Sequence, residues 1–217
     1  MLTAHGLAVS RIIDVSQPVG EQTAVWPGDQ PCRVDWTMRR DEGASVNVAA
    51  LTMSAHTGTH VDGPYHVDDD GERPESLPLD AFVGPAIVID ARGRDMLEPD
   101  VLDAGDIDAG MRVLFRTRER VQPGEFPTRF AAISPALAEL LGERNVPLVG
   151  TDAPSVDPFD SKTLDAHRIL GRNRVAILEN LVLDHVTPGV YTLIALPLKL
   201  READSSPVRA VLVEGQG

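Results

Sequence analysis

Short apolar stretches rich in valine and isoleucine recur along the chain, and glycine and proline separate them. Stretches of this length and composition, bounded by turn-forming residues, are typical of β-strands. The pattern predicts strands within residues 9–15, 47–55, 85–91, 112–117, 129–133, 147–152, 174–179, 190–198 and 208–213.

Two segments instead follow the period of an amphipathic helix. In residues 134–145, Ser134 can cap the first turn, Pro135 suits the first helical position and three leucines share one face. Residues 161–171 give the second helix, which we expect to end at Gly171. Because strands outnumber helices, we predict an α/β fold in which a few helices pack on a mixed β-sheet.

The composition narrows the class of protein. At 217 residues with 42% hydrophobic content, the chain is long enough for one domain with a buried core, spanning residues 1–217. Its formal net charge of -13 argues against nucleic acid or an anionic membrane as a partner, because both attract basic proteins. We find no targeting segment and no run of about 18 apolar residues, so we expect a cytoplasmic protein. The single cysteine, Cys32, cannot form an internal disulfide, and we expect it to be buried.

Three of the six histidines gather between residues 56 and 66, where an even spread would place roughly 0.3. The glycines, threonines and proline of this segment are poor helix formers. In an extended chain His56, His60, Asp62 and His66 would share one side, but four residues of strand span about 13 Å. We therefore expect the end of a strand that curls at its glycines into a tight loop, so that these side chains converge.

Convergent imidazoles and a carboxylate are suitable ligands for zinc or manganese, although a hydrogen-bonded polar turn is the alternative. His167 falls on the apolar stripe of the second predicted helix, and Glu179 shares its side of a strand with Val175 and Ile177. A buried carboxylate needs a cation or another partner. Either residue alone could be a satisfied buried polar group. With the cluster they give five or more candidate ligands, and a two-metal centre bridged by carboxylates follows as a hypothesis.

The segment HTGTHVDGPYH, residues 56–66, resembles the HxGTHxDxPxH signature of the cyclase-like metal-dependent hydrolases. The resemblance extends over nearly the whole chain, through IIDVSQPV, VWPGDQP, GTDAPSVDPFDSKTLDAH and ILENLVLDHVTPGVYTLIALPLKLREADSSPVRAVL. The last two segments favour the bacterial kynurenine formamidases (arylformamidases) over relatives such as isatin hydrolase.

This resemblance implies a swivelling β/α-type domain that assembles as a homodimer or a higher homo-oligomer. It also implies two zinc ions, the first bound by His56 and His60 and the second by His167, with Asp62 and Glu179 as bridging ligands. Manganese or cobalt would suit the same ligands.

The implied reaction is hydrolysis of N-formyl-L-kynurenine to L-kynurenine and formate, in tryptophan degradation. A divalent ion can lower the pKa of water from about 15.7 to about 7, and the resulting hydroxide can attack the formyl carbon. A second ion can polarise the carbonyl group. By the resemblance, His66 is the proton donor and acceptor, and Trp26, on a WPGD turn, contacts the substrate.

Several alternatives stay open on the sequence alone. His66 could be a third metal ligand, and Trp26 could be a packed tryptophan of a surface loop. The substrate could be another aryl or cyclic amide such as isatin, or the chain could be a nonenzymatic metal-dependent binding protein. A serine nucleophile is disfavoured because no GxSxG occurs. The acidic loop 68–73 could bind a hard cation such as calcium, but a solvated loop is the simpler interpretation.

Overall fold

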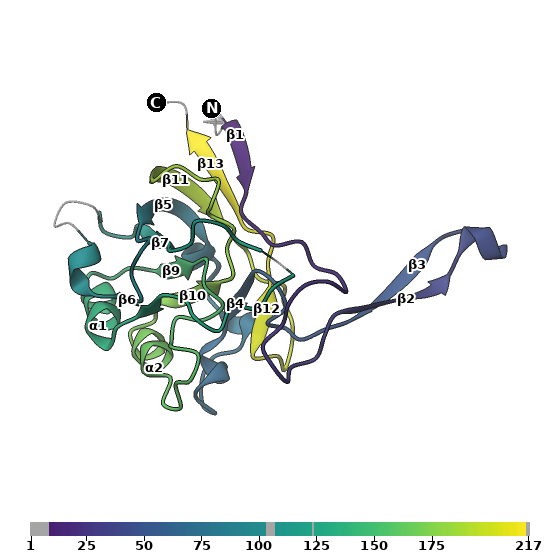
Figure 1. The fold of residues 1–217 in the computed structure, drawn as a ribbon, viewed down its shortest axis with the longest axis horizontal. Coiled ribbons are helices and arrows are strands. Elements are labelled where there is room, and N and C mark those ends of the chain that lie inside the picture. Colours follow the sequence, from purple (N-terminus) through teal and green to yellow (C-terminus); the bar gives the residue numbers. More distant parts are fainter. Residues whose placement is uncertain (1–8, 103–106, 123, 216–217) are drawn as a thin grey trace, which may run out of the picture.

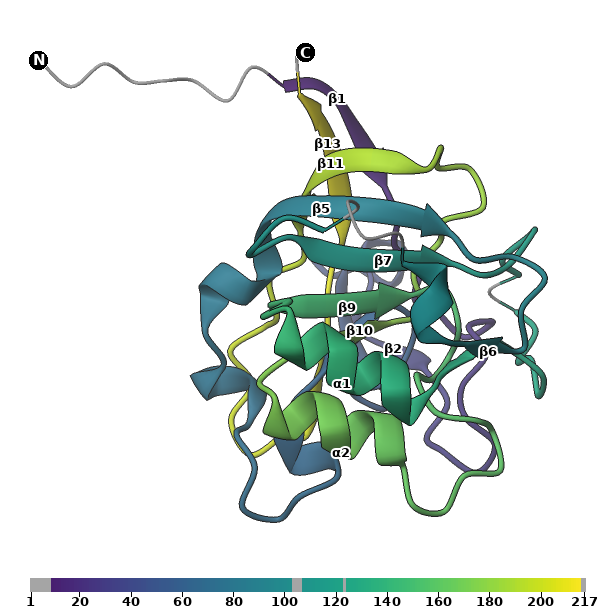
Figure 2. The same ribbon diagram turned by 90° about the vertical axis from the view of Figure 1, so that its left-hand side faces the viewer.

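The computed structural model describes residues 9–102, 107–122 and 124–215, and its main feature is one curled β-sheet. Two α-helices cover one face of this sheet (Figures 1 and 2). The strands follow in the spatial order β1 (Val9–Asp14), β13 (Val211–Gly215), β11 (Gly189–Ile194), β5 (Val83–Asp90), β7 (Arg112–Arg116), β9 (Leu148–Thr151), β10 (Ala176–Glu179), β4 (His60–Asp62) and β12 (Ser205–Pro207). The predicted mixed sheet with few packing helices is confirmed.

The strands β5, β7, β9 and β10 run parallel at the centre, and antiparallel strands flank them on both sides. Parallel strands covered on both faces need apolar residues on both, and every residue of β9 is buried. One apolar core lies between the helices and the sheet, and another lies against the opposite face. Ligands commonly bind beyond the carboxyl ends of such strands, and β10 ends at Glu179.

The first predicted helix is confirmed as α1 (Pro135–Glu143), in which the Ser134 hydroxyl accepts a hydrogen bond from the amide of Leu137. The second is α2 (Asp165–Arg172), so both predicted ends were wrong. Leu164 has a left-handed backbone with φ of 48°, which stops the helix from extending back to residue 161. Gly171 lies inside the helix and not at its end.

Each of the nine predicted strand segments overlaps a strand, but two of these strands lie outside the main sheet. Residues 129–133 contribute only β8 (Ala132–Ile133), which pairs with β6 (Met96–Leu97). Residues 47–55 contribute β3 (Val48–Thr52), which pairs with β2 (Arg33–Met38). None of the nine segments covers β2, β4, β6 or β12. Short 3-10 helices complete the fold: η1 (Arg40–Glu42), η2 (Pro64–His66), η3 (Pro74–Ser76), η4 (Leu79–Phe82) and η5 (Pro99–Val101).

The histidine-rich segment follows a different path from the one predicted. A loop comes first and contains His56, then the buried strand β4 begins at His60, and His66 ends the 3-10 helix η2. The curl occurs at Gly58, whose φ of 68° is in the left-handed region. Gly63 keeps an extended backbone, but a Cβ there would lie 2.9 Å from the carbonyl oxygen of Glu72.

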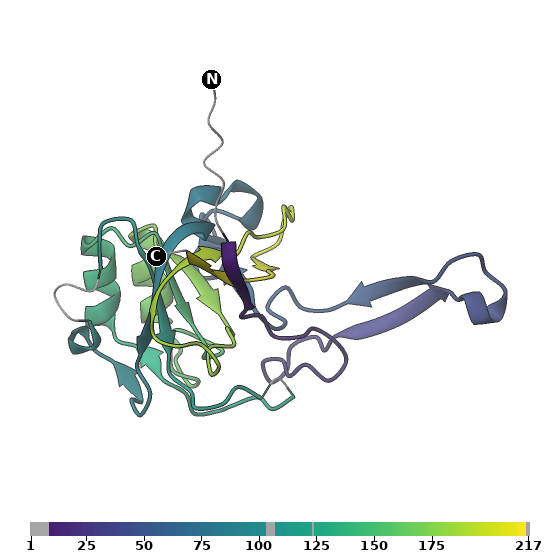
Figure 3. The same ribbon diagram turned by 90° about the horizontal axis from the view of Figure 1, so that it is seen from above.

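Strands β2 and β3 form a two-stranded arm that projects away from the main sheet (Figures 1 and 3). Every residue of β3 is exposed, as are all residues of β2 except Val34. Cys32 lies just before the arm and is buried, as expected. Within the described residues, no helix is long and apolar enough to cross a bilayer.

Candidate metal centre

The register between β4 and β10 places three polar side chains on one face of the sheet. His60 lies opposite Glu179, and Asp62 follows two residues further along β4. Directly opposite residues, and residues two apart on a strand, point to the same face. Helix α2 packs against β10 and brings His167 to this face. All four side chains are at most 4% exposed.

Each of the two carboxylates faces both histidines, with a different oxygen toward each. Asp62 Oδ1 lies 3.4 Å from His60 Nε2, and Asp62 Oδ2 lies 3.4 Å from His167 Nε2. Glu179 repeats the arrangement, with Oε2 at 3.5 Å from His60 Nε2 and Oε1 at 3.5 Å from His167 Nε2. These separations are longer than an ordinary N–H···O hydrogen bond of about 2.7–3.2 Å.

The same separations suit pairs of ligand atoms on one metal ion. Two atoms that each lie about 2.1 Å from an ion, at a tetrahedral angle, are about 3.4 Å apart. His60 Nε2 and both Asp62 oxygens are buried and have no hydrogen-bond partner among the described residues, which is costly unless a cation meets them. Three compact groups could hold an ion: His56, His60 and Asp62; Asp62, His167 and Glu179; and, nearer to solvent, His56, His66 and Asp204. This nitrogen and oxygen donor set fits zinc, manganese or cobalt.

Contacts on the far side of each imidazole fix its orientation. His60 Nδ1 donates to the carbonyl oxygen of Gly58 at 2.8 Å, and His167 Nδ1 donates to Asp157 at 2.6 Å. Asp157 also accepts hydrogen bonds from the amides of Ala166 and His167 at the start of α2. A ring that donates through Nδ1 presents Nε2 as the atom available to a metal ion.

His56 and His66 extend the cluster toward solvent. His56 Nδ1 lies 3.1 Å from Asp62 Oδ1, and its Nε2 donates to Asp204 Oδ2 at 2.9 Å. His66 Nδ1 donates to the same Asp204 oxygen at 3.2 Å. The amide of Gly63 donates to the main-chain carbonyl of Asp204 at 2.8 Å. Asp204 therefore links a candidate metal ligand to the side chain predicted to move protons.

The electrostatics of the cluster favour positive charge on or between its imidazoles. Burial would lower the pKa of His60, but the negative charge of Asp62 and contact with Glu179 raise it to about 10. Burial opposes the same change at His56, where the hydrogen bond to Asp204 and the nearby negative charge of Asp62 raise the pKa to about 9. Burial alone would raise the pKa of Asp62, yet the nearby His60 holds it well below its usual range. Protons and metal ions therefore compete for the same nitrogens.

A cavity of about 610 Å³ opens onto this cluster and has an aromatic wall. The ring centroid of Trp26 lies 5.2 Å from that of Phe126 and 5.1 Å from that of Phe159. The predicted WPGD turn is present, since the amide of Asp29 donates to the carbonyl oxygen of Trp26 at 2.9 Å. Trp26 remains 37% exposed. The cavity thus combines a polar cluster with a stacking surface for an aromatic ring.

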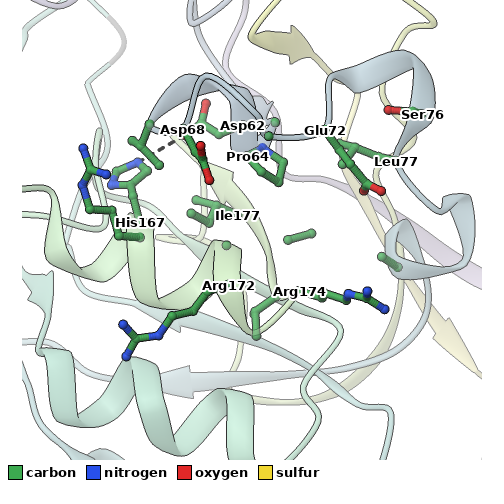
Figure 4. A pocket seen from close by; sticks show the side chains of 18 of the residues that line it. Asp62, Pro64, Asp68, Glu72, Ser76, Leu77, His167, Arg172, Arg174 and Ile177 are labelled. Carbon is green, nitrogen blue, oxygen red and sulfur yellow. Dashed lines mark ion pairs between the residues drawn. The ribbon is translucent and has the colours of Figure 1, made fainter.

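A second cavity, of about 590 Å³, borders the other side of Asp62 and His167 (Figure 4). Figure 4 shows the ion pair between these two side chains, with Glu72 across the cavity and Arg172 and Arg174 near the end of α2. The tryptophan and the histidines at positions 56, 60 and 66 border the first cavity and not this one. The first cavity is therefore the candidate substrate site.

The structure brings every predicted site residue to this region: His56, His60, Asp62, His66, His167 and Glu179 in one cluster, and Trp26 on the wall of the adjoining cavity. Sequence reasoning missed Asp157, Asp204, Phe126 and Phe159. Asp157 lies eight residues before α2 begins at Asp165, so its contact with the start of that helix leaves no local capping signal in the sequence. Asp204 gives no such signal either, because it is 138 residues from His66.

Comparisons with known proteins agree with this geometry. Residues 13–158 match the family described as "Putative cyclase". A Bacillus cereus protein named kynurenine formamidase is 44% identical over 206 residues, which cover 95% of this chain and 99% of that protein. One of the same name from Salinibacter ruber is 48% identical over 204 residues, covering 93% and 96%. A solved potential metal-dependent hydrolase with cyclase activity has a TM-score of 0.83 at 28% identity, covering 95% and 99%. Isatin hydrolase A from Labrenzia aggregata has a TM-score of 0.82 at 26% identity, covering 95% and 94%.

The contact between Asp157 and His167 gives a prediction about metal affinity. Asp157→Asn keeps a carbonyl oxygen for the amide of Ala166 but places an amide group against His167 Nδ1, so zinc affinity should fall about 10- to 100-fold. Competition with a chromophoric chelator measures this change. The matched control is Asp160→Asn, which alters an exposed residue of the same loop. Equal zinc affinity in the two variants would contradict the role given to Asp157.

Proposed function

The chain belongs to the cyclase family, and on this basis we propose that it hydrolyses N-formyl-L-kynurenine to L-kynurenine and formate. Relatives named kynurenine formamidase are 43–48% identical to it over nearly their full length, which supports this substrate. The proposal includes a role in tryptophan degradation in the cytoplasm. The observation that carries the chemistry is the pair of carboxylates that each face two histidines.

We further propose that two zinc ions occupy the cluster, with manganese or cobalt able to replace them. His56 and His60 would hold the first ion, and His167 would hold the second. Asp62 and Glu179 would contribute to both, since each turns one oxygen toward His60 and the other toward His167. Bound at this site, divalent ions would supply a hydroxide at neutral pH and Lewis acidity toward the formyl oxygen.

The side chain of His66 is placed to move the proton. Its Nδ1 donates to Asp204, so Nε2 is the ring atom that exchanges a proton with the reactants. Its ring centroid lies 4.5 Å from that of His56 and 5.7 Å from that of His167, above the candidate ligands. His66 Nε2 takes a proton from the attacking water and delivers it to the departing aryl amine. Asp204 holds the ring in the orientation that this transfer requires.

The aromatic wall orients the substrate. Trp26 and Phe159 are tilted by 34° to each other and both border the cavity, so an aryl ring can stack on this surface. Stacking there directs an ortho formamide group toward the histidine cluster. The wall also favours aromatic amides over aliphatic ones, which agrees with an arylformamidase.

Hydrolysis of isatin is the second candidate, because isatin hydrolase A shares the fold over 95% of this chain. Its identity of 26% is well below that of the relatives named kynurenine formamidase. A nonenzymatic metal-dependent binding protein is the third candidate, and the two experiments that follow distinguish among them.

Turnover of formylkynurenine and isatin on one zinc-loaded preparation tests the substrate. We expect formylkynurenine to be hydrolysed with the higher kcat/KM, and a chelator to abolish the activity until zinc is restored. The release of L-kynurenine, followed by absorbance, measures the rate. Higher kcat/KM for isatin would support the second candidate, and full activity after removal of all metal would refute the mechanism.

His66→Ala tests the proton transfer. We expect kcat to fall at least about 100-fold while most bound metal remains, because His66 is not one of the proposed ligands. Metal analysis and steady-state kinetics on the same sample check both parts. His185→Ala, at an exposed histidine outside the cavity, is the control and should keep wild-type kcat. Wild-type activity in His66→Ala would remove this assignment, and bound metal without turnover in the wild type would favour a binding protein.

We also propose that the chain forms a homodimer or a higher homo-oligomer through its arm. An isolated two-stranded ribbon is only marginally stable in water. On one face of the arm Val34 lies opposite Leu51, and Trp36 lies opposite Ala49. Leu51 is 62% exposed and Trp36 is 49% exposed, so the described residues leave much of this apolar face uncovered. A second copy would bury it.

Sedimentation of an arm variant tests this assembly. The double variant Trp36→Ser with Leu51→Ser should shift the protein from dimer or larger species toward monomer, because it removes the exposed apolar face. The control is Val190→Ser, at a position that is 64% exposed on β11 and away from the arm. A monomeric wild type, or a double variant that associates as tightly as wild type, would contradict the proposal.

A further inference from the structure

Apart from the histidines, the charged side chains that line the substrate cavity are acidic, with one exception. Asp29, Asp204 and Glu179 all border it. Among the described residues that line the cavity, Lys162 is the one lysine or arginine. Its side chain is exposed and makes no ion pair or hydrogen bond with another described residue. A lysine on a cavity wall whose ammonium pairs with no described residue is available to bind a ligand.

The loop that bears Lys162 is fixed at both ends by the site. Phe159, three residues earlier, packs against Trp26 on the aromatic wall. His167, five residues later, belongs to the metal cluster. Inside the loop the amide of Ser161 donates to the carbonyl oxygen of Pro158 at 2.9 Å, and the Ser161 hydroxyl accepts from the amide of Leu164 at 3.1 Å. The backbone at Lys162 is thereby held between the stacking surface and the candidate ligands.

We propose that Lys162 binds the carboxylate of the substrate and so selects aryl formamides that carry an amino-acid side chain. The inference rests on the proposed function and deepens it. In N-formylkynurenine the α-carboxylate lies at the far end of the chain that starts next to the formamide. With the formamide at the metal cluster and the ring on the aromatic wall, this carboxylate has to bind elsewhere on the wall, away from the carboxylates of Asp29, Glu179 and Asp204. The ammonium of Lys162 attracts the carboxylate. Because this ammonium is exposed, its contact with the carboxylate has a small desolvation cost.

Two substrates that differ in the carboxylate separate this inference from the proposed function. N-formyl-L-kynurenine carries the charged side chain, and formanilide is a neutral aryl formamide without it. The quantity to measure is the ratio of their kcat/KM values on the zinc-loaded protein. Lys162→Met should lower this ratio about tenfold, chiefly through KM for formylkynurenine, and Lys162→Arg should restore most of it.

The chain provides a matched control in Lys199, its other lysine, which is exposed and lines neither cavity. Lys199→Met should leave the ratio at the wild-type value. Inhibition by the product gives a second readout: Lys162→Met should weaken L-kynurenine about tenfold as a competitive inhibitor, with little effect on 2-aminoacetophenone, which lacks the carboxylate.

Each outcome bears on one proposal or the other. An unchanged ratio in Lys162→Met, with both substrates cleaved, overturns the carboxylate site and leaves the proposed function standing. Unchanged inhibition by L-kynurenine in that variant has the same meaning, because Lys162 would then contribute nothing to binding the carboxylate. A wild-type protein that cleaves neither formamide overturns the proposed function, and the inference falls with it.

Discussion

The burial of two carboxylates on one face of the sheet is the constraint on which the rest of the site depends. Asp62 and Glu179 lie on adjacent strands and are at most 4% exposed. Like charges in so dry a place repel each other, and each is costly to bury unless a cation meets it. His60 and His167 meet both carboxylates through Nε2, but at separations better suited to shared metal ions than to hydrogen bonds. The register of the three-residue strand β4 on β10 places His60 and Asp62 on the same face as Glu179.

Irregular segments around the sheet are shaped to keep these groups in place. The left-handed backbone of Gly58 allows its carbonyl oxygen to accept from His60 two residues later. The loop 68–73 exposes its acidic side chains, as expected of a solvated loop. Its backbone also packs against the segment that carries His66. At Gly71 it approaches the 3-10 helix that carries His66 so closely that a Cβ would lie 2.4 Å from the carbonyl carbon of Pro64. Glycine is therefore required there by packing and not by the turn alone.

Periodicity and composition predicted the strand segments, the helix α1 and the candidate ligands. Features that depend on contacts between distant parts of the chain could not be predicted. Strand segments and α1 follow from local patterns, and the histidine cluster with inward-facing His167 and Glu179 gave the candidate ligands. Leu164 continues the apolar stripe of α2, so its left-handed backbone could not be foreseen. The arm has the alternation of a half-buried strand pair, and no local signal shows that it leaves the sheet. Asp204 reaches His56 across 148 residues, a distance that only the folded chain can close.

The charges around the centre support the proposal of two divalent ions over a single ion. Asp62 and Glu179 lie between the histidines, while Asp157 and Asp204 lie behind two of them. Ionised, these four carboxylates are balanced by two divalent ions. A single ion would leave two negative charges for imidazolium groups to offset, and a protonated imidazole cannot bind a metal. Two ions also leave the centre close to neutral, with little surplus charge to draw in a carboxylate. Lys162, which pairs with no described residue, is then the group on the cavity wall that can attract a carboxylate.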